Sequence, residues 1–287
     1  MKKTISAVCR TLKKATPLYL ALLVVCGALA NAGVALPGPM QWAYTPVEKT
    51  TTYAMSVAET FERAQETPQT PAIPDTIVSE AGVFWNTYVT NEGQEISYVI
   101  RVPENVTTNM PLIVYLHEDG ITNIPTLAKV GAVQAAENNN INSCIIIQPL
   151  SETEWTVEQK EAIVRELTQH ITAKFYCDET RVVLTGFEAG AVAVWYYAAL
   201  TPEYWTAISP VSAAPKTDIE PLIGKNIDCY MVFGEYDVYS IKGEMHRVGK
   251  TLQENGATVF QIVMEQADHS VVRAQAYDND WFAWACN

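Results

Sequence analysis

Short apolar runs and amphipathic stretches alternate along the chain after residue 80. Two β-rich runs, residues 83–90 and 96–102, flank the turn-forming residues 91–94 and predict a hairpin. Beyond them, apolar runs typical of buried strands recur between stretches with helical periodicity. These runs predict strands at residues 112–116, 143–148, 181–185, 205–209, 229–233 and 259–263.

Helices are predicted between the strands, and residues 157–175 give the clearest pattern. There Ile163, Leu167 and Ile171 recur every four residues, with charged residues on the opposite face. The other helices are expected at residues 124–136, 189–200, 241–256 and 271–286. Strand-helix alternation predicts an α/β fold with a mostly parallel central sheet and helices on both faces. Active sites in such sheets lie beyond the carboxyl ends of the strands.

Composition and the N-terminal segment set the domain organisation. Of 287 residues, 48% are hydrophobic and 18% charged, which is typical of a globular protein. Residues 81–287 suffice for one large α/β domain. Residues 1–36 combine a basic start with the apolar run 18–30 and predict a signal peptide cleaved after Ala30 or Ala32. If that run continues through Leu36, the segment is instead an uncleaved membrane anchor. Residues 37–80 are expected to form a linker with one short helix at 52–65.

Either interpretation of the N-terminus places the folded domain outside the cell or at its surface. The only charges before Glu48 are five basic residues, and the remaining 14 basic and 32 acidic residues give a net charge of −18. A field of that sign excludes nucleic acid as a partner and limits membrane contact to an uncleaved N-terminal segment. In such a compartment Cys144, Cys177, Cys229 and Cys286 can form disulfides in three connectivities, or stay as buried thiols.

One turn carries the pattern of a nucleophile elbow. The predicted strand 181–185 runs into Gly186-Phe187-Glu188-Ala189-Gly190 and then a helix, the strand-turn-helix context in which G-x-S-x-G presents a nucleophile. An acid, Asp237, follows a later strand, and His269 follows the last one. The chain order of elbow, acid and histidine is that of α/β-hydrolase catalytic triads.

These segments resemble the extracellular esterases related to polyhydroxybutyrate depolymerases and feruloyl esterases. The similarity rests on residues 184–190, 208–212, 269–270 and 276–279, with Trp195 and Trp284, and spans roughly residues 96–284. The resemblance implies an α/β-hydrolase fold, with Asp237 as the acid, His269 as the general base and position 188 as the nucleophile site. It also implies a substrate or ligand, small or polymeric, in the cleft above the sheet, and no cofactor.

The sequence departs from the resemblance at two places. Glu188 stands where the family's pattern has serine, and a carboxylate that attacks an ordinary ester forms an anhydride without gain. His117, Glu118, Asp119 and Gly120 occupy the place of the oxyanion loop, which together with Ala189 is expected to form the oxyanion region. An acid there would oppose the negative charge that develops in ester hydrolysis.

Three hypotheses follow from these residues. The first is a silent esterase homologue that serves as a binding or scaffold domain. The second is an active hydrolase of non-serine chemistry, in which Glu188 attacks an alkyl carbon or activates water. In the third, Glu118, Asp119, Glu188 and Asp237 converge with His269 to hold a metal cation. The oligomeric state is open at this point.

Overall fold

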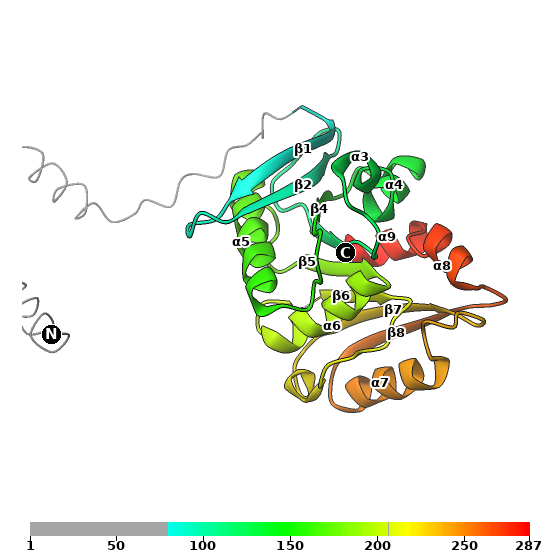
Figure 1. Cartoon of the computed structure of the whole chain (residues 1–287). Helices are drawn as coiled ribbons and strands as arrows, with labels where there is room; N and C mark the ends of the chain where they lie inside the picture. The colour runs from blue at the N-terminus through cyan, green and yellow to red at the C-terminus, as the bar shows by residue number, and fades with distance from the viewer. Residues whose placement is uncertain (1–79, 206) are drawn as a thin grey trace, which may run out of the picture. The chain divides into compact units, whose positions relative to one another are not determined.

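The computed structural model describes residues 80–205 and 207–287, which contain an eight-stranded sheet (Figure 1). The strand order is β1-β2-β4-β3-β5-β6-β7-β8. β1 and β2 form the predicted antiparallel hairpin, β2 also pairs antiparallel with β4, and every pairing from β4 through β3 to β8 is parallel. The strands are β1 Gly82–Val89, β2 Glu95–Val102, β3 Leu112–Leu116, β4 Ile145–Pro149, β5 Val182–Phe187, β6 Ala207–Val211, β7 Asp228–Gly234 and β8 Thr258–Met264.

Helices cover both faces of this sheet. One apolar cluster joins it to α5, α6 and α7, and a second joins its other face to α3, α4, α8 and α9. Figure 1 shows α8 and α9, in red, on the same side as α3 and α4. The predicted mostly parallel sheet with helices on both faces is confirmed. The helical elements are α3 Ile124–Leu127, α4 Gly131–Asn138, α5 Glu158–Phe175, α6 Ala189–Leu200, the 3-10 turn Glu220–Leu222, α7 Lys242–Glu254, α8 His269–Gln275 and α9 Asn279–Ala285.

The central strands are buried on both faces, which explains their continuous apolar runs. Along β3, Leu112, Val114 and Leu116 join the cluster under α5 to α7, whereas Ile113 and Tyr115 join the other. Full burial of such a side chain stabilises the fold by about 1.5–3 kcal/mol. The carboxyl ends of the parallel strands therefore form a rigid edge, from which the loops that carry polar residues rise.

Two predicted helices are each divided in the structure. The helix expected at 124–136 is α3 followed by α4, because the chain turns at Gly131 with φ 61°. A Cβ at Gly131 would lie 2.3 Å from the Tyr115 ring, so the backbone approach requires glycine. The helix expected at 271–286 is α8 followed by α9. Asp278 starts the second helix by accepting the Trp281 N–H, because an aspartate N-cap favours a new helix over continuation.

The predicted signal peptide or anchor, the linker and its short helix lie outside the described residues. Within residues 80–205 and 207–287, none of the helices combines the length and apolar character needed to cross a membrane.

Candidate active site

The turn between β5 and α6 carries Glu188 at its centre. Its backbone has φ 52° and ψ −111°, a conformation that costs a non-glycine residue about 1–3 kcal/mol. Gly190 lets α6 approach the end of β3, since a Cβ there would lie 1.9 Å from the Leu116 carbonyl oxygen. A Cβ on Gly186 would likewise lie 2.6 Å from the Gly190 carbonyl carbon. The packing thus forces a tight turn, which presents Glu188 at the carboxyl edge of the sheet.

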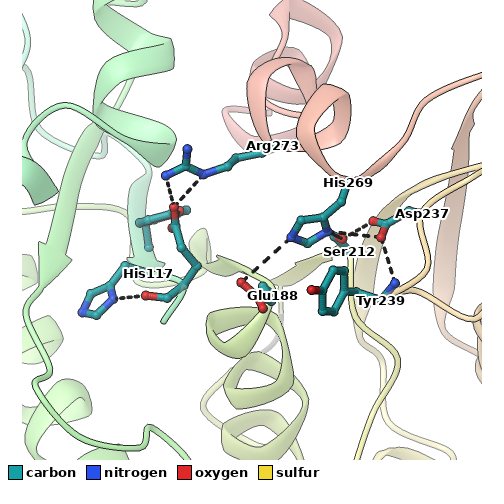
Figure 2. A network of polar contacts seen from close by, with 9 residues as sticks. His117, Glu188, Ser212, Asp237, Tyr239, His269 and Arg273 are labelled. Carbon is teal, nitrogen blue, oxygen red and sulfur yellow. Dashed lines mark hydrogen bonds and ion pairs between the residues drawn. The ribbon is translucent and has the colours of Figure 1, made fainter. Parts of the chain in front are cut away.

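The structure brings Glu188, Asp237 and His269 together from three separate segments (Figure 2). His269 is the first residue of α8, and its Nδ1 lies 3.1 Å from Asp237 Oδ1. Its Nε2 faces Glu188 Oε2 at 3.9 Å. The Asp237 side chain has no exposed surface, whereas Glu188 is 32% exposed and His269 24%. Only the Glu188 end of this chain of contacts is open to a ligand.

Ser212 is a fourth member of the network, and sequence reasoning gave it no role. It follows β6 with φ 63° and is fully buried. Its hydroxyl donates to Asp237 Oδ2, and its oxygen lies 2.9 Å from His269 Nδ1. The Tyr239 N–H donates to Asp237 Oδ1 at 3.0 Å. The buried carboxylate is therefore surrounded by donors, which fixes its orientation toward the imidazole.

This arrangement assigns the tautomer of His269 and fixes the plane of its ring. The Asp237 carboxylate can only accept a hydrogen bond, so His269 Nδ1 carries the proton that it donates to Asp237. The other ring nitrogen, Nε2, points to Glu188. The imidazole lies between Phe187 and Tyr239, with ring centroids 4.7 Å and 4.4 Å away. Nε2 therefore has the orientation of a general base, but its nearest ionisable neighbour is a carboxylate.

His117 anchors the loop that follows β3. It is buried, its Nε2 accepts the Ser151 N–H at 3.0 Å, and its Nδ1 donates to the Glu118 carbonyl at 2.7 Å. The Trp155 indole donates to the His117 carbonyl at 2.9 Å. Burial lowers the pKa of His117, which keeps the imidazole neutral so that Nε2 can accept. His117 holds the loop in place and does not contact Glu188, Asp237 or His269.

Glu118 is paired with an arginine that the sequence analysis overlooked. Its carboxylate is buried and accepts two hydrogen bonds from the Arg273 guanidinium, one from Nε at 2.8 Å. The Tyr115 hydroxyl donates to its other oxygen at 3.1 Å. The charge of Glu118, which the sequence analysis expected to oppose an oxyanion, is therefore compensated by Arg273. Arg273 lies one helical turn after His269 on α8, so the helix that carries His269 also carries the partner of Glu118, a pairing that no local sequence pattern indicates.

The other residues of the predicted oxyanion region lie closer to the surface. Asp119 and Gly120 are exposed, and Gly120 adopts φ 86°. Ala189 is the first residue of α6, where backbone N–H groups have no partner within the helix. Its N–H is the donor best placed by the elbow to receive a developing negative charge.

The predicted cation site is not formed. Among residues 80–205 and 207–287, no three His, Cys, Asp or Glu side chains are grouped so that they could hold a metal ion. Glu118 is committed to Arg273, Asp237 is committed to His269 and Ser212, and Asp119 is exposed. These carboxylates follow β3, β5 and β7, but Glu118 and Asp237 have separate partners and do not converge on one site.

Known proteins agree with this architecture. The sequence model of the dienelactone hydrolase family matches residues 134–283. Poly(3-hydroxyalkanoate) depolymerase C of Paucimonas lemoignei is 26% identical over 156 residues, which cover 48% of this chain and 37% of that protein. The chain thus matches little more than a third of that relative's length.

Solved structures of esterases share the fold. A thermostable esterase superposes with a TM-score of 0.60 at 19% identity and covers 71% of this chain and 62% of its own. An S-formylglutathione hydrolase of Agrobacterium tumefaciens superposes with a TM-score of 0.55 at 14% identity. That alignment covers 74% of this chain and 98% of the hydrolase. A feruloyl esterase module of Clostridium thermocellum, complexed with sinapinate, superposes with a TM-score of 0.54 at 14% identity. That alignment covers 71% of this chain and 87% of the module. At these identities the similarity establishes the fold alone, and it confirms the predicted α/β-hydrolase architecture. Because the family model spans just over half of the sequence, this chain belongs to the dienelactone hydrolase family, within the esterase-like and depolymerase-like α/β-hydrolases.

Proposed function

We propose that this chain binds a ligand at the elbow, beside Glu188, and does not hydrolyse carboxylic esters by the serine mechanism. The observation that carries the proposal is the Glu188 carboxylate at the elbow, 3.9 Å from His269 Nε2. In the serine mechanism this nitrogen takes a proton from the nucleophile hydroxyl. An ionised carboxylate has no proton to give to this nitrogen.

The charge at the elbow also opposes ester hydrolysis. The tetrahedral intermediate of that reaction develops an oxyanion close to the nucleophile, where the enzyme must offer donors. Glu188 adds a partly exposed negative charge at that place, and the positive charge of Arg273 is committed to Glu118. The partly exposed Glu188 carboxylate therefore suits a small molecule or polymer end that brings a hydrogen-bond donor or a positive charge.

Hydrolysis of p-nitrophenyl acetate by the purified full chain tests this function. We expect the wild-type rate to equal that of His269→Ala, because no proton relay serves an attacking hydroxyl. Glu188→Ser should exceed both, because Asp237, Ser212 and His269 already form the rest of a proton relay. A wild-type rate more than about tenfold above His269→Ala, equivalent to ~1.4 kcal/mol of transition-state stabilisation, would overturn the proposal.

A second candidate is a hydrolase in which Glu188 is the nucleophile. Its support is the strained backbone of Glu188, since such strain is typically retained at functional positions. Glu188 would displace a leaving group from an alkyl carbon to form an ester on its own carboxylate. His269 would then activate water to hydrolyse that ester. Incubation of His269→Gln with an epoxide or alkyl halide should leave a covalent adduct on the peptide containing Glu188, and an unmodified peptide would rule this candidate out.

We also propose that the domain is exported. The support is the basic start followed by the apolar run at residues 18–30. Expression of the full chain in a bacterial host, with N-terminal sequencing of the product outside the cytoplasm, tests this. A mature N-terminus at residue 31 or 33 indicates cleavage, an intact N-terminus in the membrane fraction indicates an anchor, and retention in the cytoplasm contradicts export.

A further inference from the structure

The sheet separates the four cysteines of the folded domain into two pairs. Cys177 and Cys229 belong to the apolar cluster under α5, α6 and α7. Cys144 belongs to the cluster on the opposite face, and Cys286 packs against that same cluster. Of the three connectivities that four cysteines allow, two would require bonds through the sheet. The fold therefore leaves Cys144 with Cys286 as its only partner among these residues.

Cys144 and Cys286 are also in contact. Cys144 directly precedes β4 and is fully buried, whereas Cys286 directly follows α9 and is partly exposed. Their side chains are hydrogen-bonded to each other. Both thiols are free in this structure, as are those of Cys177 and Cys229. A disulfide requires Cα atoms about 4.4–6.8 Å apart, and the proximity of these two thiols makes them the candidate pair.

The C-terminus is held in the position that this contact requires. The Arg181 guanidinium donates to the carbonyl groups of Trp284 and Ala285, the latter at 3.2 Å. Arg181 also forms an ion pair with Asp228 at 2.6 Å, and the Trp284 indole donates to the same carboxylate. The end of α9 is therefore fixed against the strand starts, and Cys286 is ordered although it is the penultimate residue.

The surroundings of Cys286 favour its thiolate. Its hydrogen bond with Cys144 lowers the pKa of Cys286 to about 7, against the effect of burial and with help from Ser143 and Arg181. The same contact and burial raise the pKa of Cys144. A partly exposed thiolate beside a buried thiol is the arrangement in which one cysteine attacks and the other resolves. By contrast, burial raises the pKa of Cys177 to about 12.

We propose that Cys144 and Cys286 form a disulfide that fastens the C-terminal helix to β4, by exchange with a small-molecule disulfide such as oxidised glutathione. The Cys286 thiolate attacks the external disulfide and releases one thiolate. Cys144 then gives up its proton and attacks the sulfur of Cys286, which releases the second external thiol. The net reaction converts two protein thiols and one external disulfide into one protein disulfide and two external thiols.

The bond would stabilise the part of the molecule that carries the site. It would link β4 to the segment of α8 and α9, which bears His269 and Arg273. A long loop closed by a disulfide typically raises stability, and for a domain of this size we expect a rise of about 5–15 °C in Tm. The proposal is independent of ligand binding in the cleft.

Peptide mapping of the full chain tests the pairing. After equilibration with oxidised glutathione at pH 8 and alkylation under denaturing conditions, we expect one linked pair of peptides, containing Cys144 and Cys286. The peptides with Cys177 and Cys229 should be alkylated. Iodoacetamide added to the native reduced protein should label Cys286 first. A product in which Cys144 and Cys286 are both alkylated, or linked to other cysteines, would overturn the proposal.

Thermal unfolding with and without dithiothreitol gives an independent measurement. Oxidised wild-type protein should lose its additional Tm on reduction, and Cys286→Ser should show no difference between the two conditions. Cys177→Ala is the matched control, because it removes a buried thiol on the other face and should keep the full wild-type response. Equal Tm values for oxidised and reduced wild type would contradict the stabilising role, and if Cys286→Ser does not fold, the mapping of wild type decides alone.

Discussion

Arg273 is expected to stabilise the fold because it compensates a buried carboxylate. The Glu118 side chain is 6% exposed and has three hydrogen bonds, two of them from the Arg273 guanidinium. In Arg273→Ala only the neutral Tyr115 hydroxyl would still donate to this carboxylate. Removing one partner of a fully buried ion pair costs about 3–5 kcal/mol.

Solvent reduces that cost here, because the Arg273 side chain is 50% exposed. Water would enter the space left by the guanidinium and solvate Glu118 in part. We therefore expect a loss of about 2 kcal/mol, or roughly 4–8 °C in Tm for a domain of about 200 residues. Arg247 offers the matched control, since its pair with Glu244 at 3.6 Å is mostly exposed. Arg247→Ala should change Tm by about 1 °C or less.

Differential scanning calorimetry of four proteins measures the coupling: wild type, Arg273→Ala, Glu118→Gln and the double variant. The double variant should be more stable than Arg273→Ala, because the second change removes the charge that the first leaves unpaired. If Arg273→Ala resembled Arg247→Ala, or if the two changes were additive, Glu118 would not depend on Arg273 and our account of the loop after β3 would be refuted.

Three further predictions concern the candidate site. Ser212→Ala should lower the free energy of unfolding by about 1.5–3 kcal/mol in urea denaturation, because a hydroxyl that donates to the buried Asp237 carboxylate is lost; an unchanged value would contradict its role. Glu188→Gly should raise that free energy by about 1 kcal/mol, since glycine adopts φ 52° without strain, and a decrease would mean that the side chain stabilises the fold. Burial lowers the pKa of His117 in the folded state below its unfolded value of about 6.5. Neutral His117 therefore stabilises the fold fully above about pH 6.5, and this stabilisation is lost as the pH falls through the folded-state pKa. The Tm should therefore fall on acidification below that pH, and more steeply than in His117→Gln, which cannot take up the proton.

The sequence by itself determined the fold class, most element positions and the core of the site. Strands buried on both faces require continuous apolar runs, and helices packed on one side require apolar residues every three or four positions, so both patterns are local. The elbow was equally readable, because Gly186 and Gly190 are needed by the close approach of β5, α6 and β3. Chain order then placed Asp237 and His269 at the same edge of the sheet.

Only the tertiary structure decided what neutralises each charge and which cysteines meet. Glu118 and Arg273 are 155 residues apart, and no local pattern relates them. Ser212 could be seen to follow a strand, but its hydrogen bond to Asp237 depends on the register of β6 beside β7. The predicted convergence of carboxylates failed for the same reason: proximity at a sheet edge is set by topology, whereas the partner of each carboxylate is set by side-chain packing. Glu188 alone retains an exposed charge facing a histidine, and that contact motivates the proposed function.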